Sequence, residues 1–426
     1  MQLYIHPDLS TLEQIRRRPS SSNEKVNKIC SSIIERVKSG GDKALKEIVL
    51  EIEGRDYESF EISQAEISRA KERVDAKVIE AIHQAASNIK AFHSAQMPKR
   101  IEVETQQGVL CVQKPVAIQK VGLYIPGGTA PLFSTVLMLA IPAKLAGCRE
   151  IVLCSPAGKN GAIADEVLCA ASICGVDKVF ALGGAQAIAA MAYGTESVPA
   201  VDKIFGPGNQ YVTAAKQIVA SQQTAIDMPA GPSEVMVLAD THTNPAFAAA
   251  DLLSQAEHGR DSQVILVCES EEFAQKVMEE VKKQTSVLGR RELAEAALSQ
   301  SSAVVVEGRQ QMLEIADIYA PEHLIILCDD PWEMAEKVQA AGSVFVGEYT
   351  PESAGDYASG TNHTLPTCGW ARSYSGVNID SFMRKMTLQS ISKQGLQELG
   401  STIINMAEAE GLQAHGQAVR IRLENE

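Results

Sequence analysis

Four of the eight histidines stand near acidic or amide side chains in the sequence, which makes them the first candidates for chemistry. The pairs are Gln255 with His258, Glu322 with His323, Asp356 with His363, and Glu410 with His415. The three-residue spacing of Gln255 and His258 would put both heads on one face of a helix, where they can meet one ion. Glu322 and His323 follow a proline at the start of a predicted strand, so two adjacent titratable groups stand ready for proton transfer in a crevice between strand and helix.

A metal site needs three or four nitrogen or oxygen donors that converge on one point. Gln255, His258, Asp356 and His415 would supply two nitrogens and two oxygens, a set that suits zinc without any thiolate. These residues are scattered from position 255 to position 415, so the spacing leaves open that the histidines only cap helices or lie on the surface. The other four histidines have no acidic or amide neighbour at ligand spacing, and we interpret them as structural: His6, His83, His93 and His242.

The elements that must position these residues alternate between strands and helices. Strands are predicted in two runs, the first at 121–126, 151–154, 178–182 and 203–205, the second at 235–239, 264–267, 303–306, 324–327 and 344–346. Helix-length amphipathic or apolar segments separate them, a rhythm that predicts parallel βαβ units with right-handed crossovers. The fold class is therefore α/β, with two tandem doubly wound, Rossmann-like domains.

The two ends of the chain differ from this rhythm. We expect a helical N-terminal region with a hairpin at 1–117, packing partly with the second α/β unit, and α/β domains at 118–230 and 231–372. Residues 373–426 are predicted to form a helical C-terminal arm. Within this arm, one long helix is expected from Ser381 to about His415, followed by a short apolar strand, AVRIRL.

Three glycine-rich turns follow strands of the first α/β domain, at 126–128, 183–186 and 206–209. In open parallel sheets such turns lie at the carboxyl ends of the strands, where helix N-termini bind ligands. No turn is a full GxGxxG, because the nearest, GPGNQY, lacks the third glycine. The fingerprint is incomplete, and the turns alone leave both NAD and a ligand-free role open.

The composition excludes several classes of protein. The 426 residues carry 39 Lys and Arg against 53 Asp and Glu, a formal charge of −14 that disfavours nucleic-acid and anionic-membrane partners. The longest apolar run, 136–147, is well short of the ~20 residues of a membrane-spanning helix. The start of the chain lacks a signal-peptide pattern, and the nine cysteines form no CxxC pair, so we expect a cytoplasmic protein with free thiols.

Long strings of the sequence resemble the histidinol dehydrogenase family. Examples are VGLYIPGGTAPLFSTVLMLAIPAKLAGC, IDMPAGPSEV, DLLSQAEHG and YAPEHLI. Similar blocks occur at 183–209 and 341–367, and the resemblance runs from about residue 20 to residue 419. One departure is a few extra residues at Gly158–Gly161, in a loop between a strand and a helix.

The resemblance implies an enzyme that uses one zinc per subunit and NAD to oxidise L-histidinol, through L-histidinaldehyde, to L-histidine. Two NAD⁺ would be reduced in succession. His323 would be the general base and Glu322 would activate water for the second oxidation, while zinc orients the substrate. The family also implies a homodimer in which the partner subunit completes the active site through its C-terminal arm.

Carried over by position, the resemblance assigns further roles. The zinc ligands would be Gln255, His258, Asp356 and His415, the last reaching the site from the partner subunit. The NAD contacts would be Tyr124, Gln186 and Asn209, which lie in or beside the glycine turns. The substrate contacts would be Ser233, Gln255, His258, His323, Asp356, His363, Glu410 and His415.

Three alternatives differ in chemistry. The same ligands could serve a zinc hydrolase with Glu322 as water activator and no redox cofactor. Two α/β lobes could also form a non-catalytic small-molecule binding protein. In an oxidoreductase, Cys154 or Cys148 could attack the aldehyde, but their apolar surroundings favour structural thiols.

Overall fold

The computed structural model describes residues 1–18, 24–127, 131–158 and 160–424, and it divides the chain into two units. The first unit comprises Met1–Gln96 and Gln119–Phe382, and the second comprises Met97–Ile118 and Met383–Glu426. The predicted turn residue Gly128 and one residue of the Gly158–Gly161 loop lie outside the described residues. None of the described helices has the length and apolar character needed to cross a membrane.

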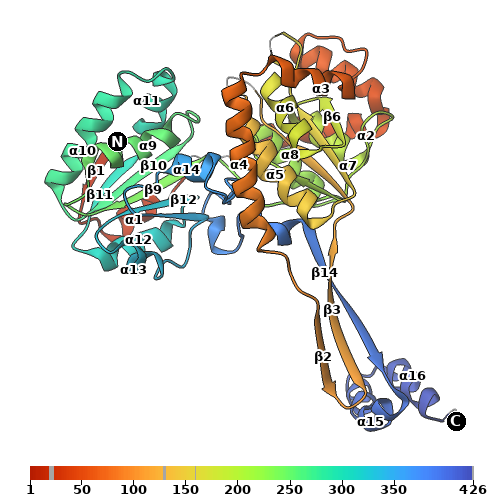
Figure 1. Cartoon of the computed structure of the whole chain (residues 1–426). Coiled ribbons are helices and arrows are strands. Elements are labelled where there is room, and N and C mark those ends of the chain that lie inside the picture. Colours follow the sequence, from red (N-terminus) through yellow and green to blue (C-terminus); the bar gives the residue numbers. More distant parts are fainter. Residues whose placement is uncertain (19–23, 128–130, 159, 425–426) are drawn as a thin grey trace. The chain divides into compact units, whose positions relative to one another are not determined.

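The first unit contains a five-stranded parallel sheet in the order β6-β5-β4-β7-β8. Its strands are β4 (Lys120–Tyr124), β5 (Glu150–Ser155), β6 (Lys178–Ala181), β7 (Lys203–Phe205) and β8 (Ala225–Ile226). The helices that follow the first four strands are α5 (Phe133–Ala146), α6 (Asp165–Cys174), α7 (Gly184–Tyr193) and α8 (Gln210–Ala220), all labelled in Figure 1. Each parallel neighbour is thus reached through a helix, as the alternation predicts.

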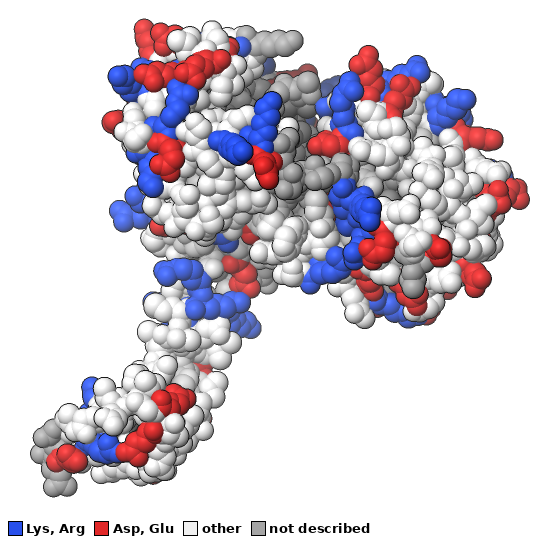
Figure 2. All heavy atoms as spheres, turned by 180° about the vertical axis from the view of Figure 1, so that it is seen from behind, with Lys and Arg blue, Asp and Glu red and all other residues white. Residues whose placement is uncertain are grey.

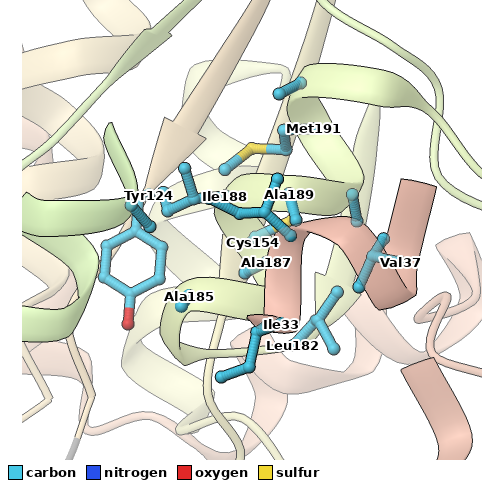
Figure 3. Close-up of a cluster of buried hydrophobic side chains, with 14 of the residues drawn as sticks. Ile33, Val37, Tyr124, Cys154, Leu182, Ala185, Ala187, Ile188, Ala189 and Met191 are labelled. Carbon is cyan, nitrogen blue, oxygen red and sulfur yellow. The ribbon is translucent and has the colours of Figure 1, made fainter. Parts of the chain in front are cut away.

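Three N-terminal helices cover the helices of this sheet. α2 (Glu24–Glu53) packs on α7 and α8, α3 (Gln64–Arg73) packs on α6, and α4 (Ala76–Ser94) packs on α5. Figure 3 shows the core under α2, where Ile33 and Val37 face the small side chains of α7. The alanines of α7 let α2 approach closely and exclude water from Tyr124 and Cys154 beneath.

A second, six-stranded parallel sheet in the same unit has the order β1-β11-β10-β9-β12-β13. Its strands are β1 (Gln2–Ile5), β9 (Glu234–Ala239), β10 (Gln263–Cys268), β11 (Ser302–Val305), β12 (His323–Leu327) and β13 (Ser343–Val346). Alternate residues of β9 enter two separate cores, Val235 and Val237 on one face, Met236 and Leu238 on the other. Both faces are therefore buried, which confirms the doubly wound α/β architecture.

Helices cover this second sheet on both faces. They are α1 (Leu9–Ile15), α9 (Pro245–Ala256), α10 (Glu271–Thr285), α11 (Arg291–Ser299), α12 (Arg309–Tyr319) and α13 (Pro331–Ala335), with α14 (Glu352–Tyr357) after β13. The helical prediction for the chain's first residues is wrong at Gln2–Ile5, which form an edge strand paired with β11. This pairing joins segments far apart in the sequence, so no local pattern signals it.

The second unit is built on an antiparallel sheet in the order β14-β3-β2. Its strands are β2 (Ile101–Gln106), β3 (Val109–Ala117) and β14 (Met383–Ile391), followed by α15 (Lys393–Ala409) and α16 (Gln413–Glu424). The predicted hairpin at its start is confirmed. The long helix expected from Ser381 is wrong over β14, because nine residues of that segment pair with β3.

The short strand expected at AVRIRL is also wrong, because these residues belong to α16. Val419 and Leu423 lie four residues apart, one helical turn, and both pack over Gly400 of α15. A side chain at Gly400 would collide with Leu423. The apolar alternation thus serves helix packing rather than a sheet.

Candidate functional site

The predicted acid–base pair lies at the amino-terminal edge of the six-stranded sheet. Glu322 directly precedes β12, and His323 is its first residue and pairs with Val235 near the start of β9. Since β9 and β12 run parallel, their first residues share one edge, and Gln255 reaches the same edge from the last turn of α9. The sequence predicts a crevice between a strand and the helix after it. The glycine turns of the five-stranded sheet follow the carboxyl ends of their strands, whereas Glu322 and His323 lie at the amino-terminal end of β12.

Glu322 is buried and held by backbone and side-chain donors. Its Oε2 accepts the backbone N–H of Glu234 at 2.9 Å and lies 3.4 Å from Nε2 of Gln255, which donates to it. Burial raises the pKa of Glu322 to about 8, even though the neighbouring His323 works against the shift. A carboxyl group with such a pKa can exchange a proton near neutral pH.

His323 is the centre of the polar cluster. Its Nδ1 lies 3.0 Å from Gln255 Nε2 and 3.2 Å from the carbonyl oxygen of Glu234, and its Nε2 lies 3.4 Å from Asp356 Oδ1. Burial opposes a charge on the ring, but the carboxylates of Glu352, Glu322 and Asp356 raise the pKa of His323 to about 10.

Three side chains form a candidate metal cluster beside this pair. His258, Glu352 and Asp356 each offer a ligand atom, and these atoms lie within 4.8 Å of one another. Burial opposes ionisation of Asp356, but His323, His363 and His258 together lower its pKa. His258 is solvent-exposed, yet the surrounding protein atoms desolvate its ring and lower its pKa. Asp356 and His258 are therefore poised as an anion and a neutral imidazole, the forms that bind a metal.

Sequence reasoning missed Glu352. It lies four residues before Asp356 on the short helix α14, a spacing that puts both carboxylates on one side and was a usable signal. The side chain is fully buried, and burial raises the pKa of Glu352 to about 8. Its Oε2 accepts from the hydroxyl of Ser254 at 3.2 Å.

The donor set fits a divalent metal ion. Among the described residues, the few buried side-chain atoms without a hydrogen-bond partner include Nε2 of His323 and Oε1 of Glu352, both in this cluster. Native proteins rarely leave such atoms unsatisfied, and a bound cation or substrate would satisfy them. Imidazole and carboxylate donors without a thiolate suit zinc.

His363 connects this cluster to the five-stranded sheet. Its Nδ1 lies 2.8 Å from the carbonyl oxygen of Asp356, and its Nε2 lies 3.2 Å from the hydroxyl of Thr135 in the first turn of α5. Since α5 follows β4, the carboxyl-terminal edge of one sheet meets the amino-terminal edge of the other.

The predicted NAD contacts gather at that carboxyl-terminal edge. Tyr124 ends β4, and its hydroxyl accepts the backbone N–H of Gly184 at 3.1 Å, two residues before the buried Gln186. Asn209 caps α8 by accepting from the backbone of Tyr211 and Val212. Burial raises the pKa of Tyr124 to about 12, so the phenol stays neutral.

The turn before α8 needs its first glycine. Gly206 has a φ of 119°, and a Cβ there would collide with the carbonyl oxygen of Tyr124. This close approach keeps the turn against the end of β4. The N-termini of α7 and α8 therefore lie at the carboxyl-terminal edge of the five-stranded sheet, beside Tyr124.

The remaining predicted site residues are placed by other elements. Ser233 directly precedes β9, next to Glu234, and its carbonyl oxygen accepts from Gln263. Glu410 follows α15 and His415 lies in the first turn of α16, both exposed and both in the second unit. The structure therefore brings one group of predicted residues together, namely Gln255, His258, Glu322, His323, Asp356 and His363. The predicted NAD contacts lie at the edge of the other sheet, and Glu410 and His415 belong to the second unit.

A second acidic cluster contradicts the interpretation of His242 as lacking acidic neighbours. His242 Nδ1 lies 2.8 Å from Asp329, and Asp240 completes the group. Sequence spacing missed this because Asp329 follows β12, whereas Asp240 follows the adjacent β9. The Asp240 carboxylate is already used by backbone N–H groups of His242, Thr243 and Asp329, so it stabilises a turn.

The alternative thiol nucleophiles are poorly suited to that role. Cys154 is fully buried in β5, and burial raises its pKa far above the ordinary value. Burial also raises the pKa of Cys148 to about 12. Neither sulfur is a thiolate near neutral pH.

Two parallel sheets with polar groups at one edge of each, including a buried acid–base pair, define an α/β enzyme. The family model of histidinol dehydrogenase matches residues 16–423. The chain is 54% identical over 424 residues to the histidinol dehydrogenase of Bacteroides fragilis, covering 100% of this chain and 99% of the relative. It is 51% identical over 430 residues to that of Campylobacter jejuni, with both chains covered completely.

A solved structure agrees. The histidinol dehydrogenase of Elizabethkingia anophelis superposes with a TM-score of 0.96 at 48% identity, over 100% of this chain and 98% of that one. The chain belongs to the histidinol dehydrogenase family, whose members oxidise histidinol in histidine biosynthesis.

Proposed function

We propose that this enzyme oxidises L-histidinol to L-histidine through L-histidinaldehyde, with zinc bound at the site and two NAD⁺ reduced in succession. The observation that supports this most is the buried Glu322–His323 pair, which lies beside His258 and Asp356 at one sheet edge. A proton-transfer pair next to a metal cluster is the arrangement that oxidation of an alcohol and then of a hydrated aldehyde requires.

Gln255, His258 and Asp356, with His415 of a second copy of this chain, would hold one zinc per subunit. When bound, zinc would orient the substrate through its imidazole and amine and offset the carboxylate charge around His323. Nε2 of His323 and Oε1 of Glu352, which accept or donate no hydrogen bond among the described residues of the single chain, support a cation or a cation-bound substrate at this place.

In the first oxidation, His323 takes the proton of the alcohol as the hydride leaves for NAD⁺. Its ring would be neutral for this step because a bound cation would offset the carboxylates that otherwise raise its pKa. In the second, Glu322 takes a proton from water as the water oxygen adds to the aldehyde carbon, and His323 returns the proton it took earlier to the aldehyde oxygen, which completes the hydrate. His323 then takes the proton of the hydrate as the second hydride leaves, and the acid is formed. The burial of both side chains excludes bulk water and protects the aldehyde from release.

NAD would bind at the carboxyl-terminal edge of the five-stranded sheet, against Tyr124, Gln186 and Asn209. The helix N-termini there offer backbone N–H groups to the pyrophosphate. On this proposal residues 118–230 are the NAD domain, and residues 231–372 are the metal and catalytic domain. Ser233 and His363 would contact the substrate from the second of these.

Residues 373–426 would form a dimerisation arm that carries His415 and Glu410 to a partner's site. Glu410 would then pair with the substrate ammonium group. Large apolar side chains of the second unit are exposed in the single chain, among them Ile101 at 51%, Val103 at 50% and Met406 at 62%. Such exposure supports a surface that a second copy covers.

The test counts NADH formed per L-histidinol consumed by zinc-loaded protein in excess NAD⁺. A ratio near two with histidine as product is expected. A ratio near one would end the oxidation at the aldehyde and remove the water-activating role of Glu322. No NADH at all would favour the zinc hydrolase, and no turnover of any kind would favour the binding protein.

A further inference from the structure

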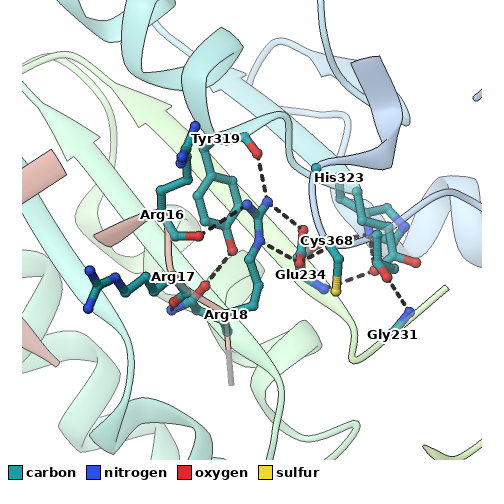
Figure 4. Close-up of polar contacts among 12 residues, drawn as sticks. Arg16, Arg17, Arg18, Gly231, Glu234, Tyr319, His323 and Cys368 are labelled. Atoms are coloured by element: carbon teal, nitrogen blue, oxygen red, sulfur yellow. Dashed lines mark hydrogen bonds and ion pairs between the residues drawn. The ribbon is translucent and has the colours of Figure 1, made fainter. Parts of the chain in front are cut away.

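A buried ion pair joins the N-terminal segment to the strand that carries the acid–base pair. Arg18 Nε donates to Glu234 Oε1 at 2.8 Å and Nη2 donates to Oε2 at 3.1 Å, a two-pronged contact (Figure 4). The Arg18 side chain is only 10% exposed and that of Glu234 only 1%. Sequence reasoning gave no role to either residue.

The surroundings of Arg18 fix its position. Nη2 also donates to the carbonyl oxygen of Tyr319 at 2.6 Å, and the guanidinium lies 3.7 Å above the ring of the same residue. On the other side, Glu234 Oε1 accepts the backbone N–H of Cys368 at 2.9 Å. The pair therefore ties together three segments: the chain after α1, the end of α12, and the loop that follows the candidate metal cluster.

The backbone of Glu234 contacts both members of the acid–base pair, Glu322 and His323. Its N–H donates to Glu322 Oε2 at 2.9 Å, and its carbonyl oxygen lies 3.2 Å from both His323 Nδ1 and Gln255 Nε2. One peptide position thus contacts two proposed catalytic side chains and one proposed metal ligand. The only described side-chain ion pair of Glu234 is with Arg18.

We propose that Arg18 and Glu234 are positioning residues, which fix the backbone at the start of β9 and through it the orientation of Glu322 and His323. This inference rests on the proposed roles of those two residues. Glu234 is buried, and burial raises its pKa while the charge of Arg18 opposes that rise, so the two groups depend on each other. Displacing reacting groups by about 1 Å can cost about 100-fold in rate, so a lost anchor acts on turnover.

The test is Arg18→Ala in the full-length, zinc-loaded enzyme, with each oxidation measured separately from L-histidinol and from L-histidinaldehyde. We expect kcat to fall about 10-fold to 100-fold for both, with the KM of each substrate within about 2-fold. Guanidinium ion at low millimolar concentration should restore several-fold of the lost kcat by occupying the vacated space. Arg17→Ala is the matched control, because Arg17 is exposed and its side chain points away from Glu234 in Figure 4.

An unchanged kcat would overturn the inference, and so would a change in KM alone. A fall in kcat that guanidinium does not reverse, and that the fraction of unfolded protein accounts for, would overturn it as well. If Arg18→Ala does not fold, Arg18→Lys keeps the charge without the two-pronged contact, and a wild-type kcat there would also overturn it. Glu322→Gln is measured alongside. If Glu322→Gln impairs neither oxidation, the proposed function fails; if it impairs aldehyde oxidation and Arg18→Ala impairs nothing, only this inference fails.

Discussion

The two sheets of the first unit present opposite edges to their candidate ligands. The five-stranded sheet gathers Tyr124, Gln186 and Asn209 at its carboxyl-terminal edge, where α7 and α8 begin. The six-stranded sheet gathers Glu322 and His323 at its amino-terminal edge, which the last turn of α9 approaches. We call these the anion edge and the cation edge.

The difference follows from the helix dipole. Helix N-termini carry partial positive charge and free N–H groups, which favour the phosphates of a dinucleotide. A helix C-terminus carries partial negative charge and favours a cation, and α9 ends at Ala256, two residues before His258. Beside it lies Asp356, whose lowered pKa keeps it negatively charged, together with the carboxyl groups of Glu352 and Glu322, which a cation would ionise. Two similar sheets thus acquire opposite ligand preferences from the edge they use.

On the face that Figure 2 shows, basic and acidic side chains do not repeat this contrast. In Figure 2 they are interspersed over the visible surface of the first unit. Substitutions at the two edges test the proposed contrast directly.

Replacing His323 with Asn should break the cation edge most severely. The amide cannot accept the alcohol proton, so kcat for both oxidations should fall by about 100-fold to 10,000-fold. The measurement is NADH formation from L-histidinol and from L-histidinaldehyde. His242→Asn, in the acidic turn at the other end of the same strands, is the control and should keep full activity; more than a tenth of wild-type kcat in His323→Asn would contradict the general-base role.

Replacing Asp356 with Asn should weaken metal binding at the cation edge. Removing one anionic ligand should lower zinc affinity at least about 10-fold, as even the loss of residues that support ligands does. Metal content after dialysis against a zinc buffer reports this without any activity assay. Asp329→Asn in the other acidic cluster should leave the zinc content unchanged, and equal zinc loss in both variants would refute the ligand assignment.

Replacing Glu322 with Gln should separate the two oxidations. Only the second needs an activated water, so aldehyde oxidation should lose about 100-fold while alcohol oxidation loses less. Single-turnover measurements with each substrate show the split. Equal losses in the two would mean that Glu322 serves His323 and not the water.

Replacing Asn209 with Asp should weaken NAD⁺ binding at the anion edge while keeping the helix cap. The Asp side chain still caps α8, but its charge repels the phosphates proposed to bind there. The KM for NAD⁺ should rise about 10-fold, equivalent to about 1.4 kcal/mol, with thermal stability retained. Asn209→Ala is the matched variant, because it should lose about 1 kcal/mol of stability with the cap and repel nothing; an unchanged KM in Asn209→Asp would place NAD elsewhere.

The sequence predicts the anion edge better than the cation edge. Glycine turns after strands are local signals, and they predict a ligand-binding edge of a parallel sheet. The resemblance then picks out Tyr124, Gln186 and Asn209, which lie in or beside these turns. The i, i+3 pair of Gln255 and His258 is local too. Gln255 and His258 come close to Glu322 because β9 and β12 are neighbours in the sheet. That strand order is not visible in the sequence.

Long-range pairing explains the other errors. β1 pairs with β11 and β14 pairs with β3, segments that lie far apart in the chain, so their extended form is imposed by a partner. The Arg18–Glu234 pair escaped notice for the same reason. A carboxylate opposite a guanidinium is recognisable only when the fold has placed the two together.

The last expected effect falls on stability and not on turnover, and it concerns the cost of burying carboxylates at the cation edge. Asp251 of α9 is buried, and burial raises its pKa to about 6 from an ordinary value near 3.8. Because its pKa is higher in the folded chain, the folded state holds the proton more tightly, and stability falls as pH rises from about 4 to about 6. Above that window the ionised group should cost about 1–3 kcal/mol.

Asp251→Asn should therefore stabilise the enzyme by about 1–3 kcal/mol at pH 8 and by almost nothing at pH 4. The amide oxygen can still accept the backbone N–H of Glu352, which is the hydrogen bond that opposes the pKa rise. Denaturant unfolding at the two pH values measures the difference, with Glu257→Gln, at a half-buried position just beyond the end of the same helix, as the control. If Asp251→Asn raised the free energy of unfolding as much at pH 4 as at pH 8, the effect would come from packing. The ionised Asp251 would then carry no electrostatic cost at the cation edge.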